Sequence, residues 1–120
     1  MKKTKLLFFG LIILLLASCS GNAKFEITNN SDFTIDSLCI KPSADSKQEI
    51  ISIKKGETKK YTTDMSKIPS SDGHYTISYI FTENNQSKID SFGYYTSGRS
   101  MEKLTKIEID NDSLYLDFEF

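Results

Sequence analysis

Few residues in this sequence belong to the types that commonly carry catalysis or bind transition metals. The 120-residue chain has two cysteines (Cys19 and Cys39), one histidine (His74) and one arginine (Arg99). A transition-metal site needs several histidine, cysteine or carboxylate ligands together, and a nucleophilic serine or cysteine needs a neighbouring base. His74 has no second histidine or cysteine cluster near it in the sequence, so we expect a partly exposed polar residue. The sequence therefore predicts no metal site, no cofactor and no enzyme activity.

One acidic segment could serve either as a cation site or as a turn. Asp110-Asn111-Asp112 offers the oxygen ligands that calcium prefers, with Asp117 further along the chain. The segment lacks the glycine and the terminal glutamate of a long calcium-binding loop. The same residues suit a tight hairpin turn, because Asn and Asp tolerate the positive φ that such turns require. We expect a hairpin turn, with a calcium site as the alternative.

The segment from Tyr94 to Arg99 is the candidate binding site. Tyr94 and Tyr95 are adjacent in a predicted strand, so one of them must face away from the core if the strand is regular. Tyrosine and arginine are enriched among the few interface residues that supply most of the binding energy between proteins. Tyr94, Tyr95 and Arg99 are therefore the candidate residues for binding a partner, although a structural role is the favoured interpretation. In that role one tyrosine covers the edge of the domain and Arg99 forms a surface ion pair.

The first twenty residues have the pattern of a secretory signal. Lys2, Lys3 and Lys5 precede an apolar run over 6–16, and small residues follow it. This order of a positive segment, a short apolar segment and a small-residue cleavage site is typical of a signal peptide. The apolar run is shorter than the roughly 20 residues that a transmembrane helix needs, which favours cleavage over spanning.

The residues around the predicted cut carry a more specific motif, Leu16-Ala17-Ser18-Cys19. It resembles the lipobox of bacterial lipoproteins. That resemblance implies cleavage between Ser18 and Cys19, a diacylglycerol on the Cys19 thiol, and a further acyl chain such as palmitate on the new amino terminus. Two or more chains give stable anchoring, whereas a single chain binds a membrane only marginally. Because acylation would occupy Cys19, Cys39 has no partner for an internal disulfide, and we expect it to be a small buried residue.

Composition and the residue after the cysteine bear on where the protein resides. Removal of the signal peptide leaves 12 basic residues against 16 acidic ones, about −4 in net charge, which gives no footprint for nucleic acid. The abundance of Lys, Ile, Asn and Ser is similar to that of small lipoproteins of the Bacteroidota. Ser20 is not aspartate, which, under the sorting rule of enteric bacteria, favours the outer membrane. We expect a cell-envelope protein of a Gram-negative bacterium, attached through its lipid anchor and with no nucleic-acid partner.

The elements that position these residues are predicted to be β-strands. We divide the chain into a signal peptide (1–18), a lipidated tether (19–23) and one β-sandwich domain (24–120). From residue 24 onward the apolar residues alternate with polar ones and turn clusters interrupt them, which is typical of strands. The expected strands are 25–28, 34–41, 49–54, 57–62, 73–82, 88–96, 105–110 and 113–120. Short strands at this spacing favour an all-β, immunoglobulin-like sandwich of seven or eight antiparallel strands, without the cysteine and tryptophan pattern of true immunoglobulin domains.

Several local features make these expectations testable. We expect a polar turn over 29–32, one helical turn over 64–68 and a loop over 97–100. The three consecutive apolar residues over 38–40 predict a strand covered on both faces. Alternation in the last strand predicts that Leu114, Leu116, Phe118 and Phe120 face the core.

For function, the sequence favours a non-catalytic binding or assembly module. The expected partner is an envelope protein or a glycan, docked on a strand edge or on the segment from Tyr95 to Arg99. The alternative is an immunity protein or inhibitor that neutralises an envelope toxin or hydrolase.

Overall fold

The described part of the chain forms nine β-strands. The computed structural model describes residues 21–43 and 46–120, so the predicted signal peptide, the Ser18–Cys19 junction and the start of the tether lie outside the described residues. The strands are β1 (Ala23–Asn29), β2 (Ile35–Lys41), β3 (Ile51–Ile53), β4 (Thr58–Thr63), β5 (Gly73–Phe81), β6 (Gln86–Thr96), β7 (Arg99–Ser100), β8 (Leu104–Ile109) and β9 (Leu114–Glu119). Among the described residues there is no helix, which confirms the all-β prediction. The helical turn expected over 64–68 does not form a helix, and this segment contains only a turn in which the N–H of Ile68 donates to the carbonyl oxygen of Met65 at 3.2 Å.

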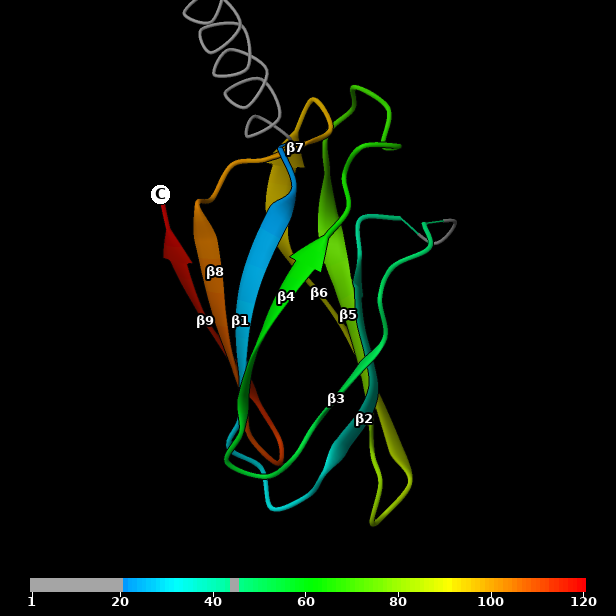
Figure 1. Cartoon of the computed structure of the whole chain (residues 1–120), viewed down its shortest axis with the longest axis vertical. Helices are drawn as coiled ribbons and strands as arrows, with labels where there is room; N and C mark the ends of the chain where they lie inside the picture. Colours follow the sequence, from blue (N-terminus) through cyan, green and yellow to red (C-terminus); the bar gives the residue numbers. More distant parts are fainter. Residues whose placement is uncertain (1–20, 44–45) are drawn as a thin grey trace, which may run out of the picture.

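The strands form two sheets, seen side by side in Figure 1. One sheet has the order β4-β1-β8-β9 and the other β3-β2-β5-β6-β7. Neighbouring strands are antiparallel except β1 and β8, which run parallel with Phe25 opposite Thr105. The expectation of seven or eight strands, all antiparallel, is therefore wrong in both respects.

The additional strand arises where a loop was expected. Arg99 and Ser100 form β7, which pairs with the end of β6 through Thr96 and Tyr95. Ser97 and Gly98, with φ of 53° and 72°, make the two-residue turn between them. Two consecutive residues with positive φ are what the tightest hairpin turns require, and they bring the chain straight back onto β6.

Both sheets contribute to one hydrophobic core. The ring of Phe25 on β1 lies edge-on to Tyr75 on β5, with ring centres 5.4 Å apart, and to Phe92 on β6, at 5.8 Å. The predicted alternation is confirmed along β5, where every second residue is buried: Tyr75, Ile77, Tyr79 and Phe81. The prediction for 38–40 is confirmed too, since Leu38, Cys39 and Ile40 are all buried and Cys39 is a free thiol. Aromatic packing and aliphatic burial thus hold the two sheets together.

Asn29, the last residue of β1, is a buried link between the sheets. Asn29 is fully buried, and its Nδ2 donates to the carbonyl oxygens of Phe33 (2.8 Å) and Ile53 (2.9 Å). Its Oδ1 accepts from the backbone N–H (3.0 Å) and the hydroxyl (2.6 Å) of Ser31, which is also buried. Because Ile53 belongs to β3, one amide side chain on β1 satisfies a backbone carbonyl of the opposite sheet.

The last strand is less covered than its alternation predicts. The β8–β9 hairpin forms as expected, with Ile107 opposite Leu116. Leu116 and Phe118 lie on the same side as the buried Ile107 and Thr105, as expected, but they remain 37% and 36% exposed, and Phe120, which the alternation also predicts to face the core, is 81% exposed. The reason is position, because β9 is the outermost strand of its sheet and the facing sheet covers it only in part.

Candidate functional site

The two adjacent tyrosines of β6 have different environments. Tyr95 is 5% exposed and its hydroxyl donates to the carbonyl oxygen of Pro42 at 3.2 Å. Tyr94 is 45% exposed and its hydroxyl donates to a carboxylate oxygen of Asp72 at 3.1 Å. Gly93, with φ of 68°, precedes them at a shift in the β5–β6 register. The prediction that one of the pair faces away from the core is confirmed, and Tyr94 is the one that a partner can reach.

Arg99 lies against the beginning of the described chain. A Cβ atom placed on Gly21 would be 3.2 Å from Cγ of Arg99, and the N–H of Ser100 donates to the carbonyl oxygen of Gly21 at 3.3 Å. Arg99 is exposed and forms no ion pair with any described residue. Strand β7, which carries Arg99, is therefore at the same end of the domain as Gly21, the first described residue (Figure 1).

Hydrogen bonds fix the turn between β6 and β7 in place. Asp72 accepts from the N–H of Ser97 at 3.0 Å as well as from Tyr94, and the N–H of Gly98 donates to the carbonyl oxygen of Ser71 at 2.8 Å. A Cβ atom at residue 98 would be only 2.8 Å from the carbonyl oxygen of Pro69. Only glycine permits this approach, so the loop before β5 and the β6–β7 turn form one ordered unit.

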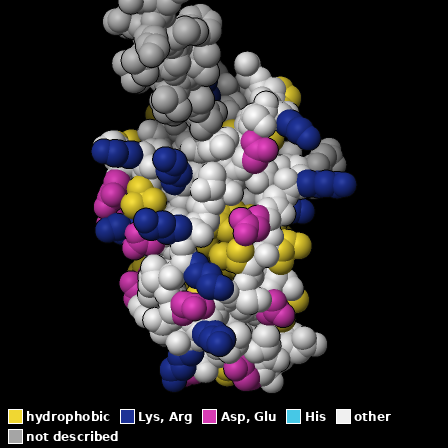
Figure 2. All heavy atoms as spheres, viewed as in Figure 1, with side chains coloured by type: hydrophobic (Ala, Val, Ile, Leu, Met, Phe, Trp, Pro, Cys, Tyr) yellow, Lys and Arg dark blue, Asp and Glu magenta, His cyan; other side chains and the backbone are white. Residues whose placement is uncertain are grey.

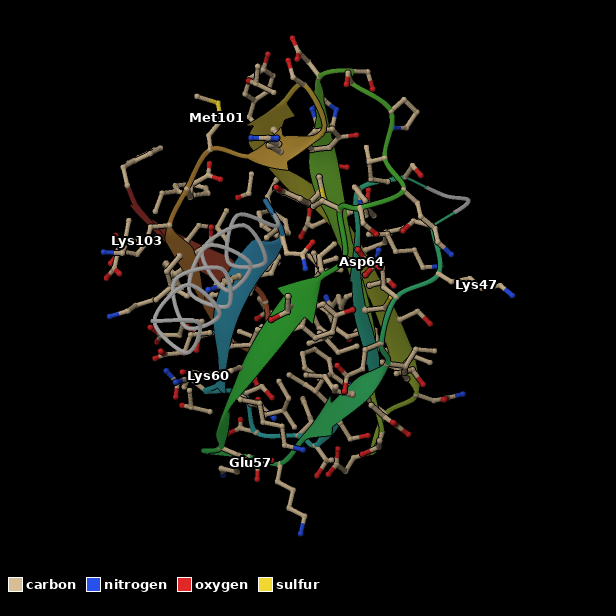
Figure 3. The ribbon with its side chains drawn as sticks, turned by 45° about the horizontal axis from the view of Figure 1, so that its top comes forward. Lys47, Glu57, Lys60, Asp64, Met101 and Lys103 are labelled. Carbon is tan, nitrogen blue, oxygen red and sulfur yellow. The ribbon has the colours of Figure 1, made fainter. Side chains whose placement is uncertain are left out.

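A hollow of about 740 Å³ lies between loops at this end, bordered on one side by Tyr95. Its walls include Lys47, Lys67 and Asp64. Figure 3 shows Lys47 and Asp64 on one side of the domain, with Met101 and Lys103 on the other. Gln48 joins the loop between β2 and β3 to the loop between β4 and β5. Its side chain donates to the carbonyl oxygen of Asp64 (2.9 Å) and accepts from the N–H of the same residue (2.8 Å).

The described residues do not assemble a cluster suited to a metal ion. No group of three histidine, cysteine, aspartate or glutamate side chains in 21–43 and 46–120 has the geometry to hold a metal ion. His74 is exposed on β5. The segment 110–112 forms the expected hairpin turn, with Asp110 N–H donating to the carbonyl oxygen of Ser113 at 2.9 Å. The side chain of Asn111 forms two hydrogen bonds of 2.8 Å with Asp32: its Oδ1 accepts from the N–H of Asp32, and its Nδ2 donates to the Asp32 carboxylate.

Two buried tyrosines differ in how their hydroxyl groups are satisfied. The hydroxyl of Tyr61 accepts from the N–H of Ile40 (3.2 Å) and donates to the carbonyl oxygen of Glu49 (2.5 Å). The hydroxyl of Tyr75 has no hydrogen-bond partner among the described residues, although the side chain is only 1% exposed. Burial raises the pKa of both phenols above the ordinary value, so both stay neutral at physiological pH.

A second candidate surface, the free edge of β9, could not be recognised from the sequence, because alternation does not show which strand is outermost.

No helix within the described residues is long and apolar enough to cross a bilayer. Comparison of the chain with protein-family models gives no match, and comparison with curated proteins gives no significant one.

Proposed function

We propose that this protein is a lipid-anchored, non-catalytic binding or assembly module of the bacterial cell envelope. The observation that carries the proposal is the Leu16-Ala17-Ser18-Cys19 motif, four residues before β1 begins at Ala23. Three residues separate Cys19 from β1, and at about 3.5 Å per extended residue they span only about 10 Å. An acylated Cys19 would hold the sandwich next to the bilayer. By the sorting rule of enteric bacteria, a residue other than aspartate after the cysteine, here Ser20, favours the outer membrane.

The residues at the end of the domain that carries Gly21 support a position next to the bilayer. Gly21 contacts Arg99, and the exposed Tyr94 is on the strand that leads into the same turn. A cation near anionic headgroups is favoured electrostatically, and tyrosine is enriched where membrane meets water. Tyr94 and Arg99 are therefore suited to contact a membrane surface or a partner lying along it.

The architecture supports binding more than chemistry. Two sheets over one core of about 100 residues suit an immunoglobulin-like sandwich, which is our proposal for the fold type. Such a domain has few places that exclude water, and binding can use its strand edges and end loops instead. A protein or a glycan of the envelope is the proposed partner.

The proposal can be tested by crosslinking in the source bacterium. The full chain carries a photoreactive amino acid at Tyr94 or at Tyr115, an exposed residue of β9. It is irradiated in cells and purified, and its adducts are identified by mass spectrometry. We expect a specific envelope component that a crosslinker at the buried Tyr79 does not capture. A captured toxin or hydrolase whose activity the protein blocks would instead identify an inhibitor or immunity protein. Capture of no component beyond that of an unrelated lipoprotein would contradict a binding role.

A further inference from the structure

The strand β9 is one of the two edge strands of the four-stranded sheet, and β4 is the other. Antiparallel pairs alternate between those that exchange hydrogen bonds and those that do not. Asp110 and Ser113 form a bonded pair, so Tyr115 and Asp117 also bond to β8, whereas the N–H and C=O groups of Leu116 and Phe118 point away from it. No described strand lies beyond β9. Its outer edge is therefore a ladder without a partner.

The inner face of this edge is apolar and partly uncovered. Leu116 and Phe118 face the same side as the buried Ile107 and Thr105, their partners on β8. More than a third of each side chain remains exposed, and Phe120 is almost fully so. An added strand with apolar residues at the matching positions would cover this surface and extend the core by one strand.

The outer face carries charges that alternate in sign from strand to strand. Lys60 on β4 lies opposite Glu26 on β1, Glu26 lies opposite Lys106 on β8, and Lys106 lies opposite Asp117 on β9. Lys106 also forms an ion pair with Glu119 at 3.3 Å, and these acids raise its pKa. Figure 2 shows basic and acidic side chains interspersed over the face in view. The alternation ends at Asp117, which has a basic neighbour on one side only.

We propose that the edge of β9 binds an extended segment of a partner protein, which adds to the sheet as a fifth strand. The segment alternates apolar residues, which face Leu116 and Phe118, with lysine or arginine, which faces Asp117 and Glu119. This inference rests on the proposed binding function and specifies the surface and the chemistry of its partner. Backbone hydrogen bonds supply affinity in this mode of recognition, and the alternating side chains supply specificity.

A second copy of the chain fits this edge less well. The β9 strand carries Asp117 and Glu119 and no basic residue, so pairing β9 with β9 would bring four carboxylates to one edge. Like charges on neighbouring strands are destabilising. A basic segment satisfies the same backbone groups and continues the alternation of charge.

The test measures binding of two fluorescent peptides to the full chain, purified in detergent, by anisotropy. One peptide alternates lysine with valine over seven residues, and the other has glutamate in place of lysine. We expect the lysine peptide to bind about tenfold more tightly, from two cross-strand charge positions. Asp117→Lys should remove most of that preference, and Asp112→Lys, which makes the same charge change in the hairpin turn, should leave most of it.

A proline distinguishes strand addition from simple charge attraction. Leu116→Pro removes an N–H that faces away from β8, so it keeps the β8–β9 ladder and the net charge. We expect it to weaken the lysine peptide at least about tenfold, while Leu116→Ala, which keeps the N–H, weakens it only about two- to fivefold. Thermal unfolding of both variants checks that the domain is folded.

Several outcomes would overturn the inference. These are no binding of the lysine peptide, equal binding of the two peptides, binding that Leu116→Pro leaves unchanged, and self-association of the chain that Leu116→Pro abolishes, which would identify a second copy as the occupant. The crosslinking experiment separates this failure from failure of the proposed function. An envelope partner captured equally by the wild type and Leu116→Pro would preserve the binding role and exclude β9, whereas no partner of the wild type would contradict the role itself.

Discussion

Replacing Asn29 with alanine should destabilise the domain more than any other exchange of a polar side chain in the first turn. The substitution removes two hydrogen bonds that the amide donates, to Phe33 and Ile53, and two that it accepts from Ser31. Each bond contributes about 1 kcal/mol, and a buried acceptor left without a donor adds to the cost. We expect a loss of about 3–4 kcal/mol in the free energy of unfolding.

The neighbouring Asn30 supplies a matched control. It is the same residue type and also hydrogen-bonds through its side chain, to a carboxylate oxygen of Glu108, but it is exposed. Asn30→Ala should cost at most about 0.5 kcal/mol, as surface substitutions usually do.

Urea and thermal denaturation of the full chain, followed by circular dichroism, measure both variants. At about 4–8 °C for each kcal/mol in a domain of this size, Asn29→Ala should lower the Tm by about 12–32 °C. A loss below about 1 kcal/mol, or equal losses for Asn29→Ala and Asn30→Ala, would refute the reasoning that the amide of Asn29 joins the two sheets.

Two further predictions concern the buried tyrosines. Tyr61→Phe should lower the free energy of unfolding by about 2 kcal/mol, because it leaves Ile40 N–H and the Glu49 carbonyl without their partner. Tyr75→Phe should be neutral or stabilise the domain by up to about 1 kcal/mol, because it removes an unsatisfied hydroxyl. Urea denaturation measures both variants, and a larger loss for Tyr75→Phe than for Tyr61→Phe would contradict these hydrogen-bond assignments. Stability should also fall in alkali. Burial raises the pKa of Tyr79 to about 12, so the folded state favours the neutral phenol, and this contribution is complete below the ordinary tyrosine value near 10 and is lost as the pH rises toward 12. Urea midpoints between pH 8 and pH 11 should decline, and a Tyr79→Phe variant should decline less; midpoints that rise with pH would contradict the direction of the shift.

Much of the fold could be predicted because alternation of apolar and polar residues fixes which side of a strand is buried. On β5 the pattern is uninterrupted, and Tyr75, Ile77 and Phe81 are buried as expected. The same rule predicts the β8–β9 hairpin and the division of Tyr94 from Tyr95. Local pattern was sufficient for β5, which has a neighbouring strand on each side.

The features that could not be predicted depend on contacts between distant parts of the chain. Asparagine is typical of turns, so the sequence at Asn29 predicts an exposed turn residue. Its burial depends on β3, because its side chain donates to the carbonyl of Ile53, which lies 24 residues further along the chain. Parallel pairing of β1 with β8 joins residues about as far apart as the domain allows. Alternation in β9 indicates an apolar face without indicating that the strand is outermost, and for that reason its partly uncovered face and free edge were not predicted.

The most direct test of the central proposal is acylation of Cys19. Cells that express the full chain are fed an alkyne analogue of palmitate, and the purified protein is examined for label and for its mass. We expect label on the wild type and on Cys39→Ala, because Cys39 is buried in β2, and no label on Cys19→Ala. Labelling that persists in Cys19→Ala, or a wild-type protein that retains residues 1–18 and carries no label, would contradict a lipid-anchored module.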